Sequence, residues 1–178
     1  ISFRKGTNPQ KKEMIKRKPN KAGGGSKTNI NGLSFEGRTD LLEAFNKTSF
    51  LEVKGNQVLK DSKLIGEYFE KHSFYKFFLE KYQINYKEIN SKKYLPDAVF
   101  YNHNNDTVYI IEKKFQGGTG SVDEKLQTCD FKRKIYKKLI SPIGLNTEYY
   151  YLLNDWFKKP VYDDVFSYIV NSNCKYFI

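Results

Sequence analysis

The sequence predicts an α/β (α+β) domain in which a central mixed β-sheet is flanked by helices. Three observations support this prediction: two adjacent apolar stretches that read as strands, apolar residues at helical spacing on either side of them, and a chain of 178 residues, which is long enough for one sizeable core. Hydrophobic residues make up 39% of the chain and aromatic residues 16%, which indicates a folded protein.

The chain divides into a basic arm, residues 1–32, and a single domain, residues 33–178. Residues 1–28 contain nine Lys or Arg and one acidic residue, a net charge of +8, which leaves +3 of the total of +11 for the other 150 residues. The run Gly23–Gly25 and two prolines favour irregular structure in the arm. Such an arm can neutralise nucleic-acid phosphates, although a solvated tail has the same composition.

The first helix is expected over residues 33–46, because its apolar residues share one broad face. Asn31 or Ser34 can cap this helix, and Glu36 lies in or just inside its first turn. The apolar face consists of Phe35, Leu41, Leu42 and Phe45.

The segment that follows is harder to assign. The apolar residues of segment 50–60 fit neither the helical nor the strand spacing clearly. Residues 62–82 are expected to form one or two helices, because apolar and aromatic residues recur there at helical spacing. These residues are Leu64, Ile65, Tyr68, Phe69, Tyr75, Phe78 and Leu79.

A β-hairpin is predicted next, with strands over residues 94–101 and 107–114 and a polar turn over residues 102–106. Side chains on a strand alternate between faces, so Glu112 and Lys114 share one face with Val108 and Ile110, and Lys113 points the other way. Folding the hairpin about Asn104 places Pro96 opposite Glu112. A slip of one residue, or a β-bulge, brings Asp97 level with Glu112 instead.

After the hairpin, Ser121 and Glu124 fit a capping box that starts a helix at Val122. Pro142 and Gly144 end this helix. A third strand from Thr147 to Leu153, a helix from about Val161 to Val170 and a short strand from Lys175 to Phe177 complete the expected domain.

Two carboxylates and an ammonium group should therefore meet at one end of the sheet. Carboxylates that lie this close repel each other unless a positive charge lies between them. Mg²⁺ prefers oxygen ligands and commonly takes one or two carboxylates, and Mn²⁺ is an expected substitute. A lysine beside such a site can orient or deprotonate water, or stabilise charge on phosphorus. The pattern predicts metal-dependent hydrolysis of a phosphodiester.

Pro96-Asp97, followed on the next strand by Glu112-Lys113-Lys114, resembles the PD-(D/E)xK nuclease superfamily, which includes many type II restriction endonucleases. The resemblance implies a restriction-endonuclease-like core over Glu36 to about Leu153. It implies that Asp97 and Glu112 are metal ligands, that Lys114 is the catalytic lysine and that the Lys113 carbonyl completes the metal shell. The family also has an acidic residue on a preceding helix, and Glu36 matches that place.

Several neighbouring residues are candidates for contacts with DNA, each with a plainer alternative as a loop or surface residue. Gln116 follows the lysine on the same strand face if the strand persists, and Gly118 permits close approach of a DNA backbone. The helix after the site carries a basic side that suits phosphates. The candidates are Lys27, Arg38, Gln116, Gly118, Lys125, Gln127 and Arg133.

Other motifs are weaker. Glu52-Val53-Lys54 and Asp61-Ser62-Lys63 also have the acidic-x-Lys spacing, but no Pro-Asp strand precedes either of them. A histidine-based nuclease site would need more histidines than His72 and His103, so His103 is expected to be a turn residue. Base stacking by Tyr149, Tyr150, Tyr151 and Trp156 is possible, but packing in a strand explains these residues better.

The leading functional prediction is a Mg²⁺-dependent endonuclease that cuts double-stranded DNA, acting as a homodimer or with another subunit. The alternatives are a repair, recombination or phage nuclease, and a non-catalytic DNA-binding module. No RNA-binding signature is seen. Two cysteines, no membrane-spanning apolar run and no signal peptide in ISFRKGTNPQ lead us to expect an intracellular, cytoplasmic protein without membrane partners.

Overall fold

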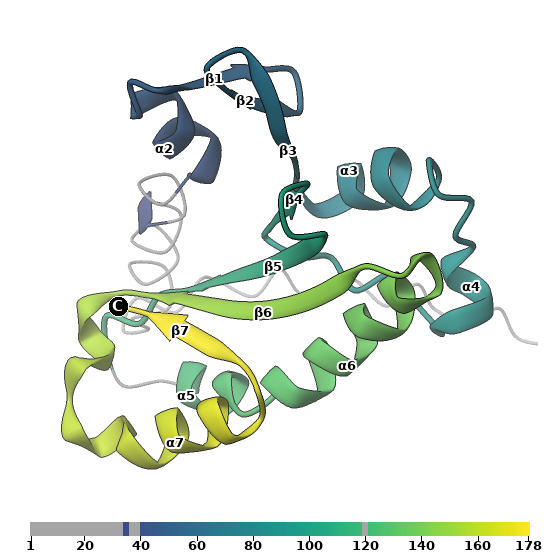
Figure 1. The fold of residues 1–178 in the computed structure, drawn as a ribbon. Coiled ribbons are helices and arrows are strands. Elements are labelled where there is room, and N and C mark those ends of the chain that lie inside the picture. The colour runs from purple at the N-terminus through teal and green to yellow at the C-terminus, as the bar shows by residue number, and fades with distance from the viewer. Residues whose placement is uncertain (1–33, 36–39, 119–120) are drawn as a thin grey trace, which may run out of the picture.

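A computed structural model of the chain describes residues 34–35, 40–118 and 121–178. Its centre is one mixed sheet of seven strands that lie in sequence order from β1 to β7 (Figure 1). Neighbours from β1 to β5 are antiparallel, whereas β5, β6 and β7 are parallel. The strands are β1 (Leu51–Lys54), β2 (Gln57–Lys60), β3 (Lys63–Phe69), β4 (Ala98–Asn102), β5 (Thr107–Lys114), β6 (Asn146–Leu153) and β7 (Lys175–Phe177).

Helices connect and cover these strands. Among the residues described, every helix is too short or too polar to cross a bilayer. The α-helices are α2 (Leu41–Lys47), α3 (Lys71–Ser73), α4 (Tyr86–Ile89), α5 (Val122–Leu126), α6 (Cys129–Ile140) and α7 (Asp163–Asn171). A π-helix, η1 (Phe74–Leu79), continues α3, and short 3₁₀ turns are η2 (Ser141–Ile143), η3 (Asp155–Lys158) and η4 (Pro160–Tyr162).

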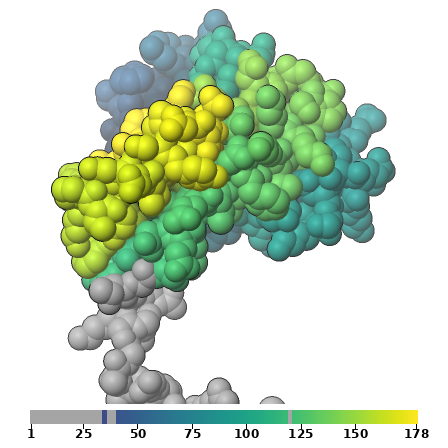
Figure 2. All heavy atoms as spheres, turned by 90° about the horizontal axis from the view of Figure 1, so that it is seen from below, coloured from purple at the N-terminus to yellow at the C-terminus, as the bar shows by residue number. Residues whose placement is uncertain are grey.

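The two faces of the sheet are covered unequally. Helices α5, α6 and α7 lie on one face (Figure 1), and in a space-filling view from below the chain's green and yellow segments cover most of that face (Figure 2). The main core lies here and includes Val108, Ile110, Tyr136 and Tyr149. On the opposite face α2 packs a smaller cluster against β2, β3 and β4. Val108 and Ile110 of β5 therefore face the main core, and Ile111 faces the smaller cluster under α2.

The C-terminal half follows the sequence prediction closely. The structure confirms the second hairpin strand over Thr107–Lys114 and the last strand over Lys175–Phe177, and the third strand begins one residue earlier, at Asn146. Gly144 ends the 3₁₀ turn after α6 with a left-handed backbone, φ 76°. The prediction of a central mixed sheet flanked by helices is therefore confirmed.

The prediction of helices over residues 62–82 is wrong for its first part. Residues 63–69 form β3, which pairs with β2 and β4 on either side. The apolar pairs Leu64-Ile65 and Tyr68-Phe69 are spaced as on a helix, but sheet pairing satisfies the backbone of β3 and tertiary context overrides the local pattern. The ambiguous residues 50–60 form β1 and β2.

Helix boundaries also differ from expectation. The carboxylate of Asp40 caps α2 by accepting hydrogen bonds from the backbone N–H groups of Leu42 and Glu43, so Ser34 is not its cap, and Asn31 lies outside the described residues. The helix predicted from Val122 does start there, but Ser121 makes no capping hydrogen bond among the described residues and the helix is divided into α5 and α6.

The first hairpin strand, expected over residues 94–101, is Ala98–Asn102. Residues 94–97 lead into it without strand pairing and are held instead by side chains from other elements, described below. The arm predicted over residues 1–32 lies outside the described residues.

We expect Gly66→Ala to destabilise the sheet. Gly66 lies on β3, and an added Cβ would meet the backbone oxygen of Tyr101 and two atoms of the Phe100 ring, the latter at 2.5 and 2.6 Å. Overpacking of this kind costs about 1–3 kcal/mol. The free energy of unfolding, measured by urea titration, should fall by this amount. The matched Gly118→Ala variant, whose Cβ would meet nothing within 4 Å, should stay within about 0.5 kcal/mol of wild type.

Candidate active site

The hairpin register brings Asp97 and Glu112 together. Ala98 pairs with Ile111, so continuing the antiparallel register by one residue places Asp97 opposite Glu112. The register centred on Asn104, with Pro96 opposite Glu112, is wrong, because the turn contains four residues, 103–106, and not the predicted five, 102–106. The predicted alternative, a one-residue shift, is the observed arrangement, and it needs no bulge between β4 and β5.

Asp97 is fixed by the backbone of the opposite strand. Its Oδ2 accepts a hydrogen bond of 2.8 Å from the backbone N–H of Lys113. This contact continues the pairing of β4 and β5 by one residue and holds the carboxylate at the end of the sheet. The side chain of Asp97 is 24% exposed, so the carboxylate is open to solvent on one side.

Two tyrosines anchor the segment that delivers Asp97. The hydroxyl groups of Tyr75 and Tyr136 donate hydrogen bonds of 2.8 and 3.0 Å to the carbonyl oxygen of Tyr94, and the Tyr94 N–H donates back to the Tyr75 hydroxyl. The Lys71 N–H also donates to the Pro96 carbonyl. These bonds come from η1, α6 and α3, so helices far apart in sequence jointly set the position of Asp97.

Glu112 is the most deeply buried acidic residue of the site, with 3% of its surface exposed. Its Oε2 contacts two ammonium groups, Lys114 Nζ and Lys132 Nζ, each at 2.9 Å. Its Oε1 is buried and accepts no hydrogen bond among the described residues. Burying a carboxylate is costly without compensation, and the two lysines provide that compensation.

The ammonium group of Lys114 lies among the oxygen atoms predicted to bind metal. Its Nζ is 2.9 Å from Glu112 Oε2, 3.0 Å from the Lys113 carbonyl oxygen and 3.6 Å from Asp97 Oδ2. The three oxygens thus already surround a positive charge. The side chain of Lys113 itself leaves on the other face of the sheet, as the strand alternation predicts.

The pKa of Lys114 is raised above its ordinary value. Burial alone would lower it, but the negative charges of Glu112 and Asp97 and their hydrogen bonds outweigh burial. Lys114 is therefore an ammonium group at neutral pH. Because the folded-state pKa is the higher one, these contacts stabilise the fold from neutral pH up to the ordinary lysine pKa. This stabilisation is lost only as the pH rises through the raised value.

A group of buried tyrosines lies behind the carboxylate. Tyr136, Tyr149 and Tyr151 have essentially no exposed surface, and Tyr151 pairs with Glu112 across the parallel strands. Burial raises the pKa of all three phenols, and the charge of Glu112 raises each further. The apolar, dry side of Glu112 thus faces the core, and its polar side faces Asp97 and the two lysines.

Lys132 was not predicted as part of this site, although it belongs to the basic helix considered for phosphate binding. It lies on α6, three residues after Cys129 and four before Tyr136, and both of these side chains are fully buried. That spacing puts Lys132 on the core-facing side of the helix. A lysine on the apolar stripe of a helix that follows the Glu-x-Lys strand was the signal in the sequence that could have identified it.

The residues just after the strand are held by Asn154, which follows β6. The Asn154 side chain accepts a hydrogen bond of 3.0 Å from the Gln116 N–H and donates one of 2.9 Å to the Gln116 carbonyl oxygen. β5 ends at Lys114, so Gln116 does not continue its face. The buried Gln116 side chain instead donates to the Gly118 carbonyl, an intramolecular role for both of these candidate DNA contacts.

Other candidate DNA contacts do not gather at the carboxylates. Gln127 lies beside Asp164 and Tyr168 of α7, and Arg133 pairs with Asp130 and lines a hollow with residues of β6 and β7. Lys125 is exposed, and its carbonyl accepts a hydrogen bond from Tyr151. Their roles in DNA binding stay predictions. Glu36, Lys27 and Arg38 lie outside the described residues.

The weaker motifs have structural explanations. Glu52 and Lys54 lie on β1, which three strands separate from β5, and Asp61 and Ser62 form the turn between β2 and β3 with positive φ angles. His103 lies in the hairpin turn, as predicted, with its Nε2 3.3 Å from Glu67 Oε2. The prediction that strand packing explains the consecutive tyrosines is confirmed for Tyr149 and Tyr151, which are core residues of β6.

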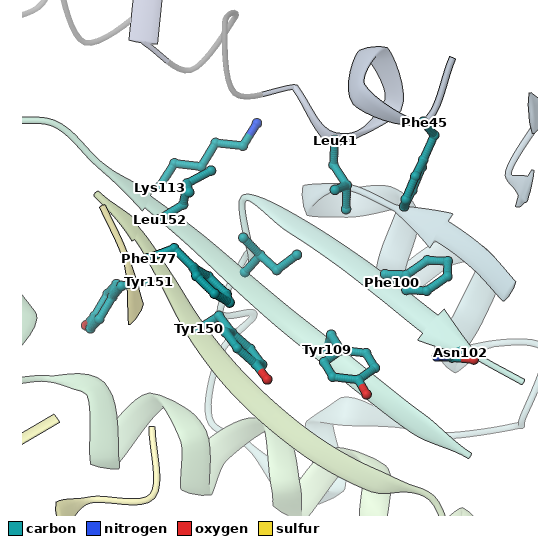
Figure 3. Close-up of a pocket in the computed structure, with 11 residues that line it drawn as sticks. Leu41, Phe45, Phe100, Asn102, Tyr109, Lys113, Tyr150, Tyr151, Leu152 and Phe177 are labelled. Atoms are coloured by element: carbon teal, nitrogen blue, oxygen red, sulfur yellow. The ribbon is translucent and has the colours of Figure 1, made fainter. Parts of the chain in front are cut away.

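The opposite face of β5 carries a different feature. An apolar groove of about 440 Å³ lies between α2 and strands β4 to β7, and Figure 3 shows the side chains that line it. Phe100, Tyr109, Tyr150 and Phe177 supply most of its aromatic surface. Lys113 alone among the residues of the Glu-Lys-Lys sequence reaches this groove, so the groove is separate from the carboxylate site.

The donor atoms of the carboxylate site fit a divalent cation that prefers oxygen. Asp97, Glu112 and the Lys113 carbonyl are hard oxygen ligands of the kind Mg²⁺ takes, and all three already contact one ammonium group. The described residues contain no cluster of three or more His, Cys, Asp or Glu side chains, so they supply two carboxylates and one carbonyl.

Comparisons with known proteins do not identify a relative of this chain, so the candidate site is argued from its geometry. No protein-family model, no curated protein and no solved structure gives a significant match to the chain.

Substitutions of Asp97 should separate its hydrogen bond to the Lys113 N–H from its negative charge beside Lys114. Asp97→Asn keeps an oxygen that can accept the Lys113 N–H, whereas Asp97→Ala removes this acceptor. We expect the alanine variant to lose about 1–2 kcal/mol of unfolding free energy relative to the asparagine variant, measured by urea titration at neutral pH. Equal stability of the two variants would show that the bond to Lys113 does not hold this end of the hairpin.

Proposed function

We propose that this chain is a Mg²⁺-dependent endonuclease that hydrolyses DNA phosphodiester bonds, acting as a small type II restriction endonuclease on double-stranded DNA. One observation carries the proposal: Lys114 Nζ lies within 3.6 Å of Asp97 Oδ2, Glu112 Oε2 and the Lys113 carbonyl oxygen, at the end of two paired strands. The Pro-Asp and Glu-x-Lys residues therefore form one cluster, as the resemblance to PD-(D/E)xK nucleases implies.

The architecture supports the same reading. Asp97 lies just before β4 and Glu112 lies near the end of β5, and α5 and α6 then cross to the parallel strand β6. In open α/β sheets, ligand-binding sites commonly form beyond the carboxyl ends of parallel strands. Here β5 and β6 are parallel, and Glu112 and Lys114 lie at the carboxyl end of β5. An arrangement of this type suits a restriction-endonuclease-like core, and by the same resemblance we propose Glu36 as a further ligand.

Within this proposal each residue has a distinct task. Asp97, Glu112 and the Lys113 carbonyl would hold Mg²⁺, which when bound supplies a Lewis acid for the phosphate and lowers the pKa of water. Lys114 enters as an ammonium group, because its pKa is raised by Glu112 and Asp97. Stabilising the negative charge that grows on the phosphate oxygens is therefore its favoured role, ahead of removing a proton from water.

Double-strand cleavage requires two such sites, since one site cuts one strand. We accordingly propose that the protein works as a homodimer or with another subunit. The excess of positive charge, +11 overall and mostly in the first 28 residues, favours a polyanionic partner such as DNA. The recognition sequence has no readable signature, because specificity lies in contacts built on the fold.

The proposal is tested by incubating the purified chain with unmethylated phage DNA and Mg²⁺. Discrete fragments that disappear with EDTA are expected. Lys114→Met should lower the cleavage rate by about 10²–10³-fold, the usual cost of removing one group that stabilises transition-state charge. The matched control is Lys54→Met, which alters the exposed Glu-Val-Lys triplet on β1 and should cleave like wild type.

Other outcomes are informative. A smear of fragments that depends on Mg²⁺ and Lys114 would indicate a nuclease of the repair or recombination type, without sequence specificity. DNA binding without cleavage would contradict the enzymatic proposal and favour a non-catalytic DNA-binding module. Equal loss of activity in Lys54→Met and Lys114→Met would contradict the assignment of the site.

A further inference from the structure

Lys132 contributes a second ammonium group to the candidate site. It extends from the second turn of α6, and its Nζ is 2.9 Å from Glu112 Oε2. The side chain is 25% exposed, whereas Lys134, two residues further on, is 64% exposed and pairs with Asp130. Lys132 is therefore directed at Glu112, in contrast to the exposed lysines of the same helix.

This contact engages the carboxylate oxygen that a metal ion would need. Glu112 Oε1 is buried and accepts no hydrogen bond among the described residues, while Oε2 is on the side of Lys114, Lys132 and Asp97. A divalent cation bound to Oε2 would be repelled by both ammonium groups that lie 2.9 Å from this oxygen, Lys114 and Lys132. Coordination through Oε2 would thus oppose the ion pair with Lys132.

The charge balance points in the same direction. Asp97 and Glu112 carry two negative charges, and Lys114 and Lys132 supply two positive charges, so the four groups are neutral together. Of the neighbouring charged residues on α6, Arg133 and Lys134 both pair with the one carboxylate of Asp130, so these three residues add a net charge of +1 beside the cluster. A neutral cluster attracts a divalent cation less than one in which the carboxylates are in excess.

We propose that Lys132 competes with the divalent cation for Glu112 and so weakens metal binding to the protein alone. The inference rests on the proposed function, because it assumes that Asp97 and Glu112 hold the metal. Lys132 acts here as a regulating residue: it stabilises the buried carboxylate and must release Oε2 when the cation enters. A cation site with such a competitor is filled at higher metal concentration than the same site without it.

The test measures metal binding rather than cleavage. Isothermal titration with Ca²⁺, and separately with Mg²⁺, is compared for wild type, Lys132→Met and the charge-retaining Lys132→Arg. We expect Lys132→Met to bind about tenfold more tightly, equivalent to 1.4 kcal/mol, and Lys132→Arg to bind like wild type. Lys134→Met removes the same charge from the exposed side of the helix and should leave the affinity unchanged.

A second neutral variant guards against loss of the fold. Lys132→Gln can still donate a hydrogen bond to Glu112 Oε2 without carrying a charge, and it should also bind metal more tightly than wild type. Circular dichroism and thermal unfolding in EDTA establish which variants are folded. If Lys132→Met does not fold, the comparison of Lys132→Gln with Lys132→Arg decides the matter.

The variant Asp97→Asn distinguishes failure of the proposed metal site from failure of the proposed competition by Lys132. If wild type, Lys132→Met and Lys132→Gln all bind no cation, the metal site and the proposed function fail together. If wild type binds, Asp97→Asn does not, and the neutral Lys132 variants bind equally or more weakly, the competition by Lys132 is refuted while the metal site stands. Tighter binding by Lys134→Met to the same degree would reduce the effect to general charge and would also refute it.

Discussion

The burial of one carboxylate, that of Glu112, is the constraint on which the candidate site depends. An ionised side chain with 3% exposure needs nearby positive charge, and here that charge comes from two different elements. Lys114 belongs to the same strand, but Lys132 reaches the carboxylate only if α6 lies against the sheet in one rotation. That rotation also buries Cys129 and Tyr136, so the core and the charge pairing favour the same placement of the helix.

The tyrosines behind Glu112 give the carboxylate two unlike sides. Tyr136, Tyr149 and Tyr151 exclude solvent from one side, and burial is the largest cause of their raised pKa values. On the other side, Oε2 meets the lysines near Asp97. Tyr136 joins the two functions, because its hydroxyl also holds Tyr94, three residues before Asp97. Packing and site geometry are thus produced by the same side chains.

Much of the C-terminal half could be predicted from the sequence because its signals are local. An apolar stretch directly after a polar turn defines β5, Gly144 ends the turn after α6, and Ser121 precedes the start of a helix. β3 could not be predicted, since Leu64, Ile65, Tyr68 and Phe69 have helical spacing and only pairing with β2 and β4 makes them a strand. That pairing is non-local and leaves no mark on the segment itself.

The site was predictable to the same extent. Asp97, Glu112 and Lys114 could be chosen from the sequence, but their register depended on whether the turn held four or five residues. Lys132 was missed for a physical reason: its role arises from the tertiary contact between α6 and β5, and in the sequence it stands among other lysines of a basic helix. Only its spacing from buried neighbours distinguishes it.

The triplet Glu52-Val53-Lys54 shows why burial, and not the order of residues, decides the chemistry. Glu52 and Lys54 form an ion pair of 3.0 Å, much like Glu112 and Lys114 at 2.9 Å, but their side chains are 52% and 63% exposed. An exposed pair of this kind is worth about 0–1 kcal/mol and leaves both groups hydrated. On β5 the same residue types lie between β4 and β6, where a carboxylate just before the neighbouring strand and a lysine on the covering helix converge. The buried, charge-paired environment of the Glu112-Lys113-Lys114 triplet therefore follows from the position of its strand inside the sheet.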